Sequence, residues 1–245
     1  METRLISPQE LAKVIDHSLL RPNLTVSAVR QGCAVAREYG VVSVCARPSD
    51  LPILVEELGG TGILITTTVG FPHGVGTTAA KVAEARDAVA GGAAEVDMVL
   101  NVGKLRSGEH RFVEDDIRAV VEAAHAGGAL VKVIFENCYL ATEEKVLACR
   151  LAEAAGADFV KTSTGFAEGG ATVEDIQLMR RTCSQKVKVK AAGGISTLDA
   201  TLAVVAAGAV RVGTSSTRGI LDEARSRTDA GGKLVLRAGP WPPPG

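Results

Sequence analysis

Three charged residues stand inside otherwise apolar runs of the chain. Asp97 lies in EVDMVLN, Lys161 in FVKTSTG and Lys190 in VKVKAAGG. Charges in such runs are rarely buried unless they are paired. A single lysine there would ordinarily extend its stem and reach solvent. Three charges in three separate runs instead favour one shared site.

Two lysines and a carboxylate suit Schiff-base chemistry. The attacking amine must be unprotonated, whereas a free lysine has a pKa of about 10.4. A second cation about 5 Å away repels the first by about 3 kcal/mol at an effective dielectric constant of about 20. That repulsion lowers the pKa by about two units. We therefore expect Lys161 to be the nucleophile, Lys190 to lower its pKa, and Asp97 to hold Lys190 and move protons.

Side-chain alternation along a strand adds a second layer of charge. Glu95 shares a face with Asp97, and Lys188 shares a face with Lys190. An unpaired charge inside a protein costs several kcal/mol. We expect Glu95 to neutralise either Lys188 or Lys132 beneath the working layer.

Two Gly- and Ser-containing segments have the composition of phosphate sites. Gly193-Gly194 and Ser215-Ser216 each follow a short apolar run near the end of the chain. Glycines let backbone N–H groups approach an anion, and hydroxyls add donors. Either segment alone is compatible with an ordinary turn. Their placement after the last two strands of the expected barrel predicts a phosphate site.

The elements that must position these residues follow one alternating pattern. β-branched runs predict strands at 14–18, 41–46, 63–69, 95–100, 130–136, 158–163, 187–192 and 210–213. Helical periodicity predicts helices at 26–39, 77–90, 112–126, 143–155, 173–182 and 198–206. Gly-Ala pairs should end four of them, at Gly92, Gly128, Gly156 and Gly208. N-caps are expected at Thr142, Thr172 and Thr197.

Eight strand–helix units in this length predict a single-domain (β/α)8 barrel over residues 1–236. A doubly wound sheet would have fewer strands and a GxGxxG turn after an early strand, which is missing here. Residues 237–245 are rich in Pro and Gly, so we expect an extended or disordered tail. Active sites of such barrels lie at the C-terminal ends of the strands, where all three charges of the expected site fall.

The composition excludes several classes of protein. With 27 Lys and Arg against 28 Asp and Glu, the net charge is -1, which offers no basic face for nucleic acid. No apolar run is long enough to span a membrane, and the polar N-terminus is unlike a signal peptide. Five cysteines without a CxxC predict a reduced, cytoplasmic protein. The four histidines lack metal-ligand spacing.

Four segments together make the sequence resemble the deoxyribose-phosphate aldolases, a class I aldolase family. They are VGFPHG at 69–74, EVDMVLN at 95–101, KTSTGF at 161–166 and KAAGGI at 190–195. The resemblance extends from about Asp16 to Thr217. It implies a barrel that reversibly cleaves 2-deoxy-D-ribose 5-phosphate to glyceraldehyde 3-phosphate and acetaldehyde. It implies no metal or other cofactor.

The resemblance also implies roles for individual residues. Lys161 would form the Schiff base, Lys190 would lower its pKa, and Asp97 would act in the proton relay. The residues that would bind the substrate phosphate are Gly165, Gly193, Gly194, Ser215 and Ser216. Asp16 and Cys45 would line the pocket, although Cys45 is equally compatible with strand packing. The Ala-rich outer helices suit a homodimer or homotetramer.

Two departures from the family pattern concern substrate binding and proton transfer. Some members end in a tyrosine that reaches the active site, whereas the tyrosines here are Tyr39 and Tyr139. Many members have an arginine after GGI or GGV, where this chain has Ser196. Phosphate binding would then rest on backbone amides, hydroxyls and the field of Lys190.

Three alternatives stay open from the sequence. A transaldolase-like enzyme would form its imine with a ketose donor. A catalytically inactive barrel would bind a sugar phosphate as a sensor or scaffold, although the intact Lys161, Lys190 and Asp97 argue against it. A metal-dependent aldolase would use Asp97, Asp158 and His73.

Overall fold

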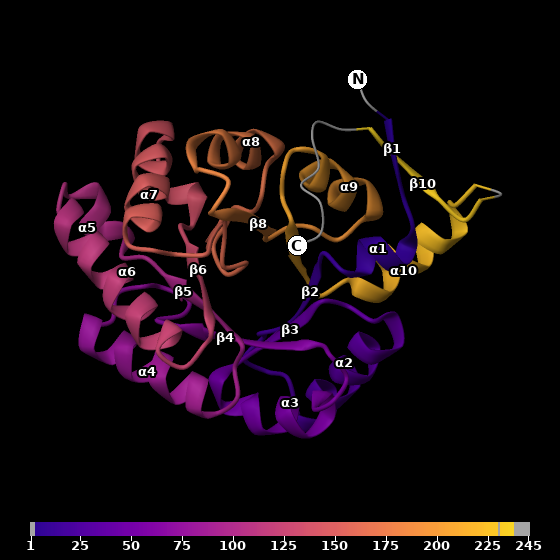
Figure 1. Cartoon of the computed structure of the whole chain (residues 1–245), viewed down its shortest axis with the longest axis horizontal. Helices are drawn as coiled ribbons and strands as arrows, with labels where there is room; N and C mark the ends of the chain where they lie inside the picture. Colours follow the sequence, from indigo (N-terminus) through magenta and orange to yellow (C-terminus); the bar gives the residue numbers. More distant parts are fainter. Residues whose placement is uncertain (1–2, 230, 238–245) are drawn as a thin grey trace.

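Eight parallel strands close into a barrel with helices around the outside (Figure 1). The computed structural model describes residues 3–229 and 231–237. The barrel strands are β2 (Ile15–Leu19), β3 (Ser43–Ala46), β4 (Leu64–Val69), β5 (Glu95–Val99), β6 (Leu130–Ile134), β7 (Phe159–Lys161), β8 (Lys188–Ala192) and β9 (Arg211–Thr214). All eight strands expected from the sequence are present, and β2 pairs with β9 to close the ring. The predicted (β/α)8 barrel is therefore confirmed.

The outward faces of the strands form the main apolar core. β5 and β6 illustrate the pattern, because Val96, Met98, Val131 and Val133 all point away from the charged barrel interior and are fully buried. Alternate residues of a strand face opposite sides. One side of each strand can therefore be apolar against the helices while the other carries charge inside the barrel.

The helices cover the barrel in chain order (Figure 1). Their bounds are α2 (Val26–Tyr39), α3 (Leu51–Leu58), α4 (Thr78–Ala90), α5 (Val102–Arg106), α6 (His110–His125), α7 (Thr142–Ala154), α8 (Val173–Thr182), α9 (Leu198–Ala206) and α10 (Thr217–Ser226). Short 3-10 turns span Pro48–Asp50 and Asn137–Tyr139. All six predicted helices are present.

The helix ends follow the predicted chemistry with one exception. The four glycines of the Gly-Ala pairs all have positive φ angles, as a left-handed helix end requires. The Thr172 and Thr197 hydroxyls accept N–H bonds from the first turns of α8 and α9. The N-cap prediction at Thr142 is wrong, because Ala141 is the cap. The Glu144 carboxylate accepts the Ala141 N–H at 2.7 Å, so that donor is satisfied without a capping hydroxyl.

Several elements were not predicted. Besides α3, α5 and α10, they are α1 (Pro8–Ala12) and a pair of strands at the chain ends. These strands, β1 (Thr3–Ile6) and β10 (Leu234–Arg237), form a separate antiparallel sheet. They lie beside α9 and α10 in Figure 1. Arg237 therefore belongs to a strand rather than to the predicted tail, and 238–245 lie outside the described residues.

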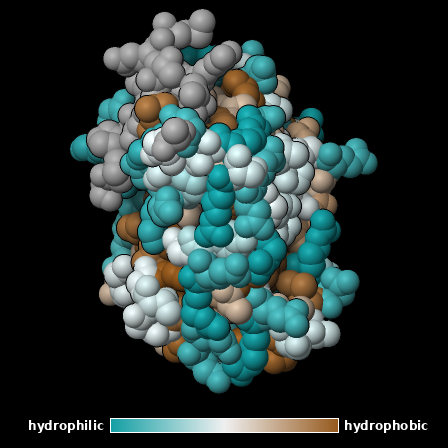
Figure 2. Space-filling model, turned by 90° about the vertical axis from the view of Figure 1, so that its right-hand side faces the viewer, coloured by the Kyte–Doolittle hydropathy of each residue, from teal (hydrophilic) through white to brown (hydrophobic). Residues whose placement is uncertain are grey.

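Hydrophilic residues dominate the face that carries α2 and α10, with smaller separate apolar areas (Figure 2). Ion pairs connect the elements there. Arg218 of α10 contacts Glu38 of α2 at 2.8 Å. Arg227, just after α10, contacts Asp199 of α9 at 2.7 Å. Exposed pairs of this kind contribute at most about 1 kcal/mol each. In the described part of the chain, no helix has the length and apolar character needed to cross a membrane.

Candidate active site

The three charges that the sequence placed in one site do meet inside the barrel. They project from β5, β7 and β8. The Nζ atoms of Lys161 and Lys190 each lie 2.7 Å from the same oxygen, Oδ2 of Asp97. Asp97 is fully buried, and the two lysines are 3% and 1% exposed. Neither lysine side chain extends out to solvent.

A second layer of charge lies beneath this site. Lys132 of β6 contacts Glu95 at 2.6 Å and the other oxygen of Asp97 at 2.9 Å. Arg211 of β9 contacts Glu95 at 3.1 Å. The predicted pairing of Glu95 with Lys132 is therefore confirmed, whereas pairing with Lys188 is wrong. Lys188 is the first residue of β8, and its side chain is exposed rather than enclosed among the inward-facing charges.

Asp16 joins the cluster from β2. Its Oδ2 atom contacts the Lys190 amine, so Lys190 is held between Asp16 and Asp97. Oδ1 of Asp16 is buried and has no hydrogen-bond partner among the described residues. Cys45 of β3 is also buried, and burial followed by the negative charge of Asp97 raises its pKa to about 12. Cys45 is thus a neutral thiol beside the charged groups.

The balance of charge in the barrel depends on Lys161. The other ionisable members of the cluster are three cations and three carboxylates, which are Lys132, Lys190, Arg211, Asp16, Glu95 and Asp97. With Lys161 uncharged, the cluster is neutral. With Lys161 protonated, it carries an excess positive charge in a buried place, which is unfavourable. The count therefore favours a free amine at Lys161.

The pKa shifts follow the same logic. Burial lowers the pKa of Lys161, and the positive charge of Lys190 adds to that effect, while Asp97 opposes both. Burial also acts against a charge on Lys190, but Asp16 and Asp97 outweigh it and raise the pKa of Lys190. Although burial opposes ionisation of Asp97, its three lysine neighbours hold its pKa well below the usual range. Lys161 thus loses its proton more readily than an ordinary lysine, whereas Lys190 holds its proton more firmly.

The loops after β7, β8 and β9 carry the five residues expected to bind phosphate. Gly165, Gly193 and Gly194 all have positive φ angles, between 74° and 87°. Ser216 is the N-cap residue of α10, and its side chain makes no capping hydrogen bond. Ser215 is exposed beside it. These loops present glycine backbone and hydroxyl groups at the C-terminal ends of three adjacent strands.

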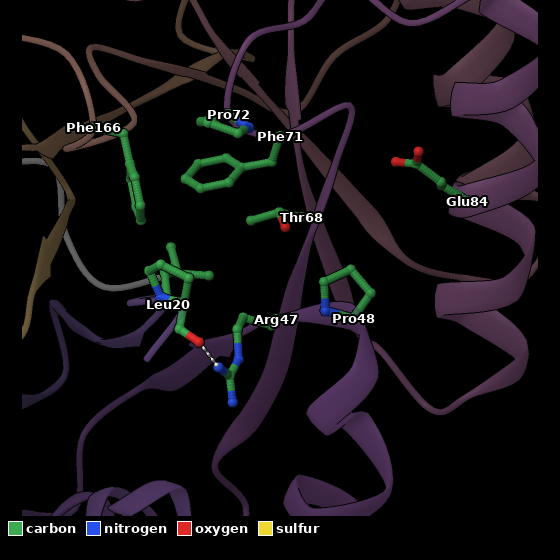
Figure 3. Close-up of a pocket in the computed structure, with 9 residues that line it drawn as sticks. Leu20, Arg47, Pro48, Thr68, Phe71, Pro72, Glu84 and Phe166 are labelled. Carbon is green, nitrogen blue, oxygen red and sulfur yellow. Dashed lines mark hydrogen bonds between the residues drawn. The ribbon is translucent and has the colours of Figure 1, made fainter. Parts of the chain in front are cut away.

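A cavity of about 310 Å³ lies at the same end of the barrel, over β4 (Figure 3). Thr68 lines it and is the register partner of Asp97. The rings of Phe71 and Phe166 meet edge to face, with centroids 5.2 Å apart. Arg47 also lines the cavity. The mouth of the barrel therefore combines an apolar wall with the charged groups beneath it.

Arg211 is a member of the cluster that the sequence reasoning missed. It begins β9 and looks like a charge at the edge of a strand. The signal that would have found it is alternation, since Arg211 and Gly213 share the inward face. A Cβ atom at Gly213 would lie 3.3 Å from the Cε atom of Lys190. The glycine therefore leaves room for that lysine to cross the barrel.

The residues of the metal-dependent alternative do not come together. Asp158 lies immediately before β7 and accepts hydrogen bonds from His125 and from the backbone of Val131, each at 2.8 Å. His73 is exposed in the loop after β4. Within residues 3–229 and 231–237, no group of three or more His, Cys, Asp or Glu side chains is arranged to hold a metal ion. The ligand set of that alternative is therefore not assembled.

Comparison with known proteins agrees with this geometry. The sequence profile of the DeoC/LacD family aldolases matches residues 11–223. A deoxyribose-phosphate aldolase from Bacillus mycoides (strain KBAB4) is 51% identical over 220 residues, which cover 89% of this chain and 98% of the relative. The tetrameric deoxyribose phosphate aldolase from Aeropyrum pernix superposes with a TM-score of 0.84 at 31% identity, covering 90% of this chain and 93% of that one. The aldolase QR15 gives a TM-score of 0.84 at 35% identity, covering 89% and 97%. The chain belongs to the DeoC/LacD family of aldolases.

Proposed function

We propose that this protein is a class I deoxyribose-phosphate aldolase. The observation that carries the proposal is the pair of buried lysines bound to one oxygen of Asp97, with Lys161 as the lysine whose pKa is lowered. An amine that attacks a carbonyl must be unprotonated, and burial beside a second cation favours that form. The substrate would be 2-deoxy-D-ribose 5-phosphate, and the products glyceraldehyde 3-phosphate and acetaldehyde.

The reaction begins when the free amine of Lys161 attacks C1 of the open-chain sugar and, with loss of water and uptake of one proton, forms an iminium ion. Removal of the proton from the C3 hydroxyl then breaks the C2–C3 bond and releases glyceraldehyde 3-phosphate. The electron pair of that bond passes into the iminium group, which becomes an enamine. Protonation at C2 and hydrolysis release acetaldehyde and regenerate Lys161. The iminium ion is the electron sink, so the scheme uses no metal or organic cofactor.

The neighbouring side chains divide the remaining tasks. Lys190 stays charged between Asp16 and Asp97 and repels a proton on Lys161. Asp97 touches both amines and is placed to move protons between them and the substrate, directly or through water. Cys45 stays a neutral thiol beside these charges.

The phosphate end of the substrate would lie against the loops after β7, β8 and β9. Glycine backbone amides and hydroxyls there are suited to an anion. The residues proposed for this contact are Gly165, Gly193, Gly194, Ser215 and Ser216. With serine at position 196, the contact depends on neutral donors and on the field of Lys190.

We further propose that the protein acts in the cytoplasm as a homodimer or homotetramer. Unpaired cysteines support a reducing compartment, since the five described thiols are all free. The tetrameric relative from Aeropyrum pernix supports a homo-oligomer. Light scattering after size-exclusion chromatography measures the mass in solution, and a single monomeric species at micromolar concentration would contradict the assembly.

The decisive test of the function is trapping with acetaldehyde and borohydride, followed by peptide mapping. We expect a reduced two-carbon adduct on Lys161 and cleavage of deoxyribose 5-phosphate that persists in a strong chelator. Lys161→Arg should abolish both. A transaldolase-like enzyme would instead be trapped with a dihydroxyacetone donor. A sugar-phosphate sensor would bind the substrate without cleaving it.

A further inference from the structure

A buried glutamate at the end of β6 has no place in the reaction scheme above. Glu136 is 4% exposed, and its backbone φ angle is 55°. Among the described residues it is the only one besides glycine with a positive φ angle. Residues other than glycine rarely adopt this conformation, and those that do cluster at functional sites. The conformation therefore needs an explanation in the contacts that the side chain makes.

All hydrogen bonds of the Glu136 carboxylate go to one residue, Thr164, in the loop after β7. The backbone N–H of Thr164 lies 3.2 Å and 3.3 Å from its two oxygens. The Thr164 hydroxyl donates to the same carboxylate and in turn accepts the N–H of Phe166 at 3.0 Å. No lysine, arginine or histidine forms an ion pair with Glu136 in the described part of the chain. A buried carboxylate without a cation needs such hydrogen bonds to be tolerated.

The far end of the same loop is fixed to the loop after β8. The N–H of Ala171 donates to the carbonyl oxygen of Gly193 at 3.0 Å. The two loops approach so closely that a Cβ atom at Gly170 would lie 2.4 Å from that oxygen. Gly165 lies between the two attachments, one residue from the Glu136 contact. It is one of the glycines assigned above to the phosphate.

The amine of the Schiff-base lysine is held by Asp97 and not by the Glu136 side chain. Lys161 lies inside the barrel strand β7, and its amine contacts Asp97 at 2.7 Å. Loss of the Glu136 contacts would release Thr164 and the backbone after it, while the charged cluster keeps its own ion pairs. The effect of Glu136 on binding can therefore be separated from the chemistry at Lys161.

We propose that Glu136 is a positioning residue for the phosphate end of the substrate, acting through Thr164 on the Gly165–Phe166 segment. The inference rests on the proposed function, since it needs a phosphorylated substrate. It assigns to Glu136 the selectivity for a phosphorylated sugar over its unphosphorylated counterpart.

The test compares two substrates, 2-deoxyribose 5-phosphate and 2-deoxyribose, in Glu136→Ala, Glu136→Gly and Glu136→Gln. Glycine relieves the backbone conformation while removing the carboxylate, so it separates backbone strain from the side-chain contacts. Glutamine keeps one carbonyl oxygen as an acceptor. A control away from the site is Glu10→Ala in helix α1, because the exposed Glu10 carboxylate also accepts an N–H and a hydroxyl from one residue, the N-cap Ser7, and pairs with Lys233.

We expect Glu136→Ala and Glu136→Gly to lose at least about 10-fold in kcat/KM for the phosphorylated sugar, mainly through KM, since charged hydrogen bonds are lost. The unphosphorylated sugar should change by less than about 2-fold, and so should acetaldehyde trapping at Lys161. Glu136→Gln should recover most of the loss. Thr164→Val should reproduce the alanine variant, and the double variant should be no worse than either one.

Equal losses for both substrates, or full activity in Glu136→Gly, would overturn the proposal. Equal losses with slower trapping would instead mark Glu136 as a general support of the barrel. Failure of the proposed function has a different signature, because the wild-type protein itself would then show no cleavage and no adduct on Lys161. Circular dichroism and thermal unfolding of each variant distinguish a misfolded chain from a positioning defect. Thr164→Val provides a second route if Glu136→Ala does not fold.

Discussion

Replacing Lys190 by leucine should move the ionisation of Lys161 toward ordinary lysine. Both amines lie 2.7 Å from one oxygen of Asp97, so they are at most twice that distance apart, about 5 Å. At this separation and an effective dielectric constant of about 20, two positive charges repel by about 3 kcal/mol. Removing the repulsion should raise the pKa of Lys161 by about two units. The charge count agrees, because without Lys190 the cluster becomes neutral only when Lys161 is protonated.

The assay is the rate of acetaldehyde trapping at Lys161 as a function of pH, with cyanoborohydride as the reductant and mass spectrometry of the peptide as the readout. At neutral pH we expect trapping in Lys190→Leu to be about 100-fold slower than in the wild type. The midpoint of the pH profile should move up by about two units, and trapping at high pH should recover. Lys190→Arg keeps the charge and should stay near the wild-type midpoint.

One side effect needs its own control. Lys190→Leu also strips Asp16 of its cation, and an unpaired buried carboxylate destabilises the barrel. The double variant Lys190→Leu with Asp16→Asn removes that charge, and its cluster is again neutral with Lys161 unprotonated, so its upward shift should be smaller than that of Lys190→Leu alone. A midpoint that stays within half a unit of the wild type in both variants would refute the tuning role of Lys190. A downward shift would refute it as well.

Three further changes test other parts of the cluster and the fold. Asp97→Asn should lower kcat/KM by about 100-fold or more, yet move the trapping profile to lower pH, because Asp97 raises the pKa of the nucleophile; an upward shift would contradict this account. Lys132→Met should cost about 3–5 kcal/mol in urea unfolding, because Glu95 and Asp97 both lose a cation and the buried cluster is left with one carboxylate in excess, whereas Lys104→Met at an exposed pair should cost less than about 1 kcal/mol. Burial lowers the pKa of His17 to about 4. As the pH falls, the unfolded chain therefore takes up the His17 proton before the folded chain does, and the free energy of unfolding should fall by about 3 kcal/mol between pH 6.5 and 4. His17→Asn should flatten this part of the plot of stability against pH, and an unchanged slope would contradict the prediction.

Sequence patterns predicted the barrel strands but not all of the elements outside the barrel. All eight barrel strands lie within the predicted ranges or extend one residue beyond them, because parallel strands between helix layers are continuously apolar. The pair β1 and β10 was missed because it joins the two ends of the chain, and the apolar runs of the two strands are only two and three residues long, Leu5–Ile6 and Leu234–Leu236. Helix α3 begins after Pro48 and contains Pro52, so its sequence resembles a turn. Such elements are fixed by their tertiary partners rather than by local pattern.

For the site, the sequence identified the residue types but not all of the pairs. Asp97, Lys161 and Lys190 were placed together because each occupies the inward face near the end of its strand. The contact between Lys190 and Asp16 spans 174 residues and depends on closure of the barrel, which no local pattern encodes. Glu136 was missed for a related reason. Its role depends on a left-handed backbone and on a loop from the next strand, and a lone glutamate gives no signal of either.

A lysine nucleophile that touches a carboxylate presents an apparent conflict, since a carboxylate favours the protonated amine. The two layers of the barrel resolve it. Asp97 contacts three amines, and one of them, Lys132, also contacts Glu95 in the lower layer. The positive charges of Lys132 and Lys190 therefore balance most of the negative charge of Asp97. The cluster therefore has no net buried charge when Lys161 is unprotonated, which is the form that attacks a carbonyl.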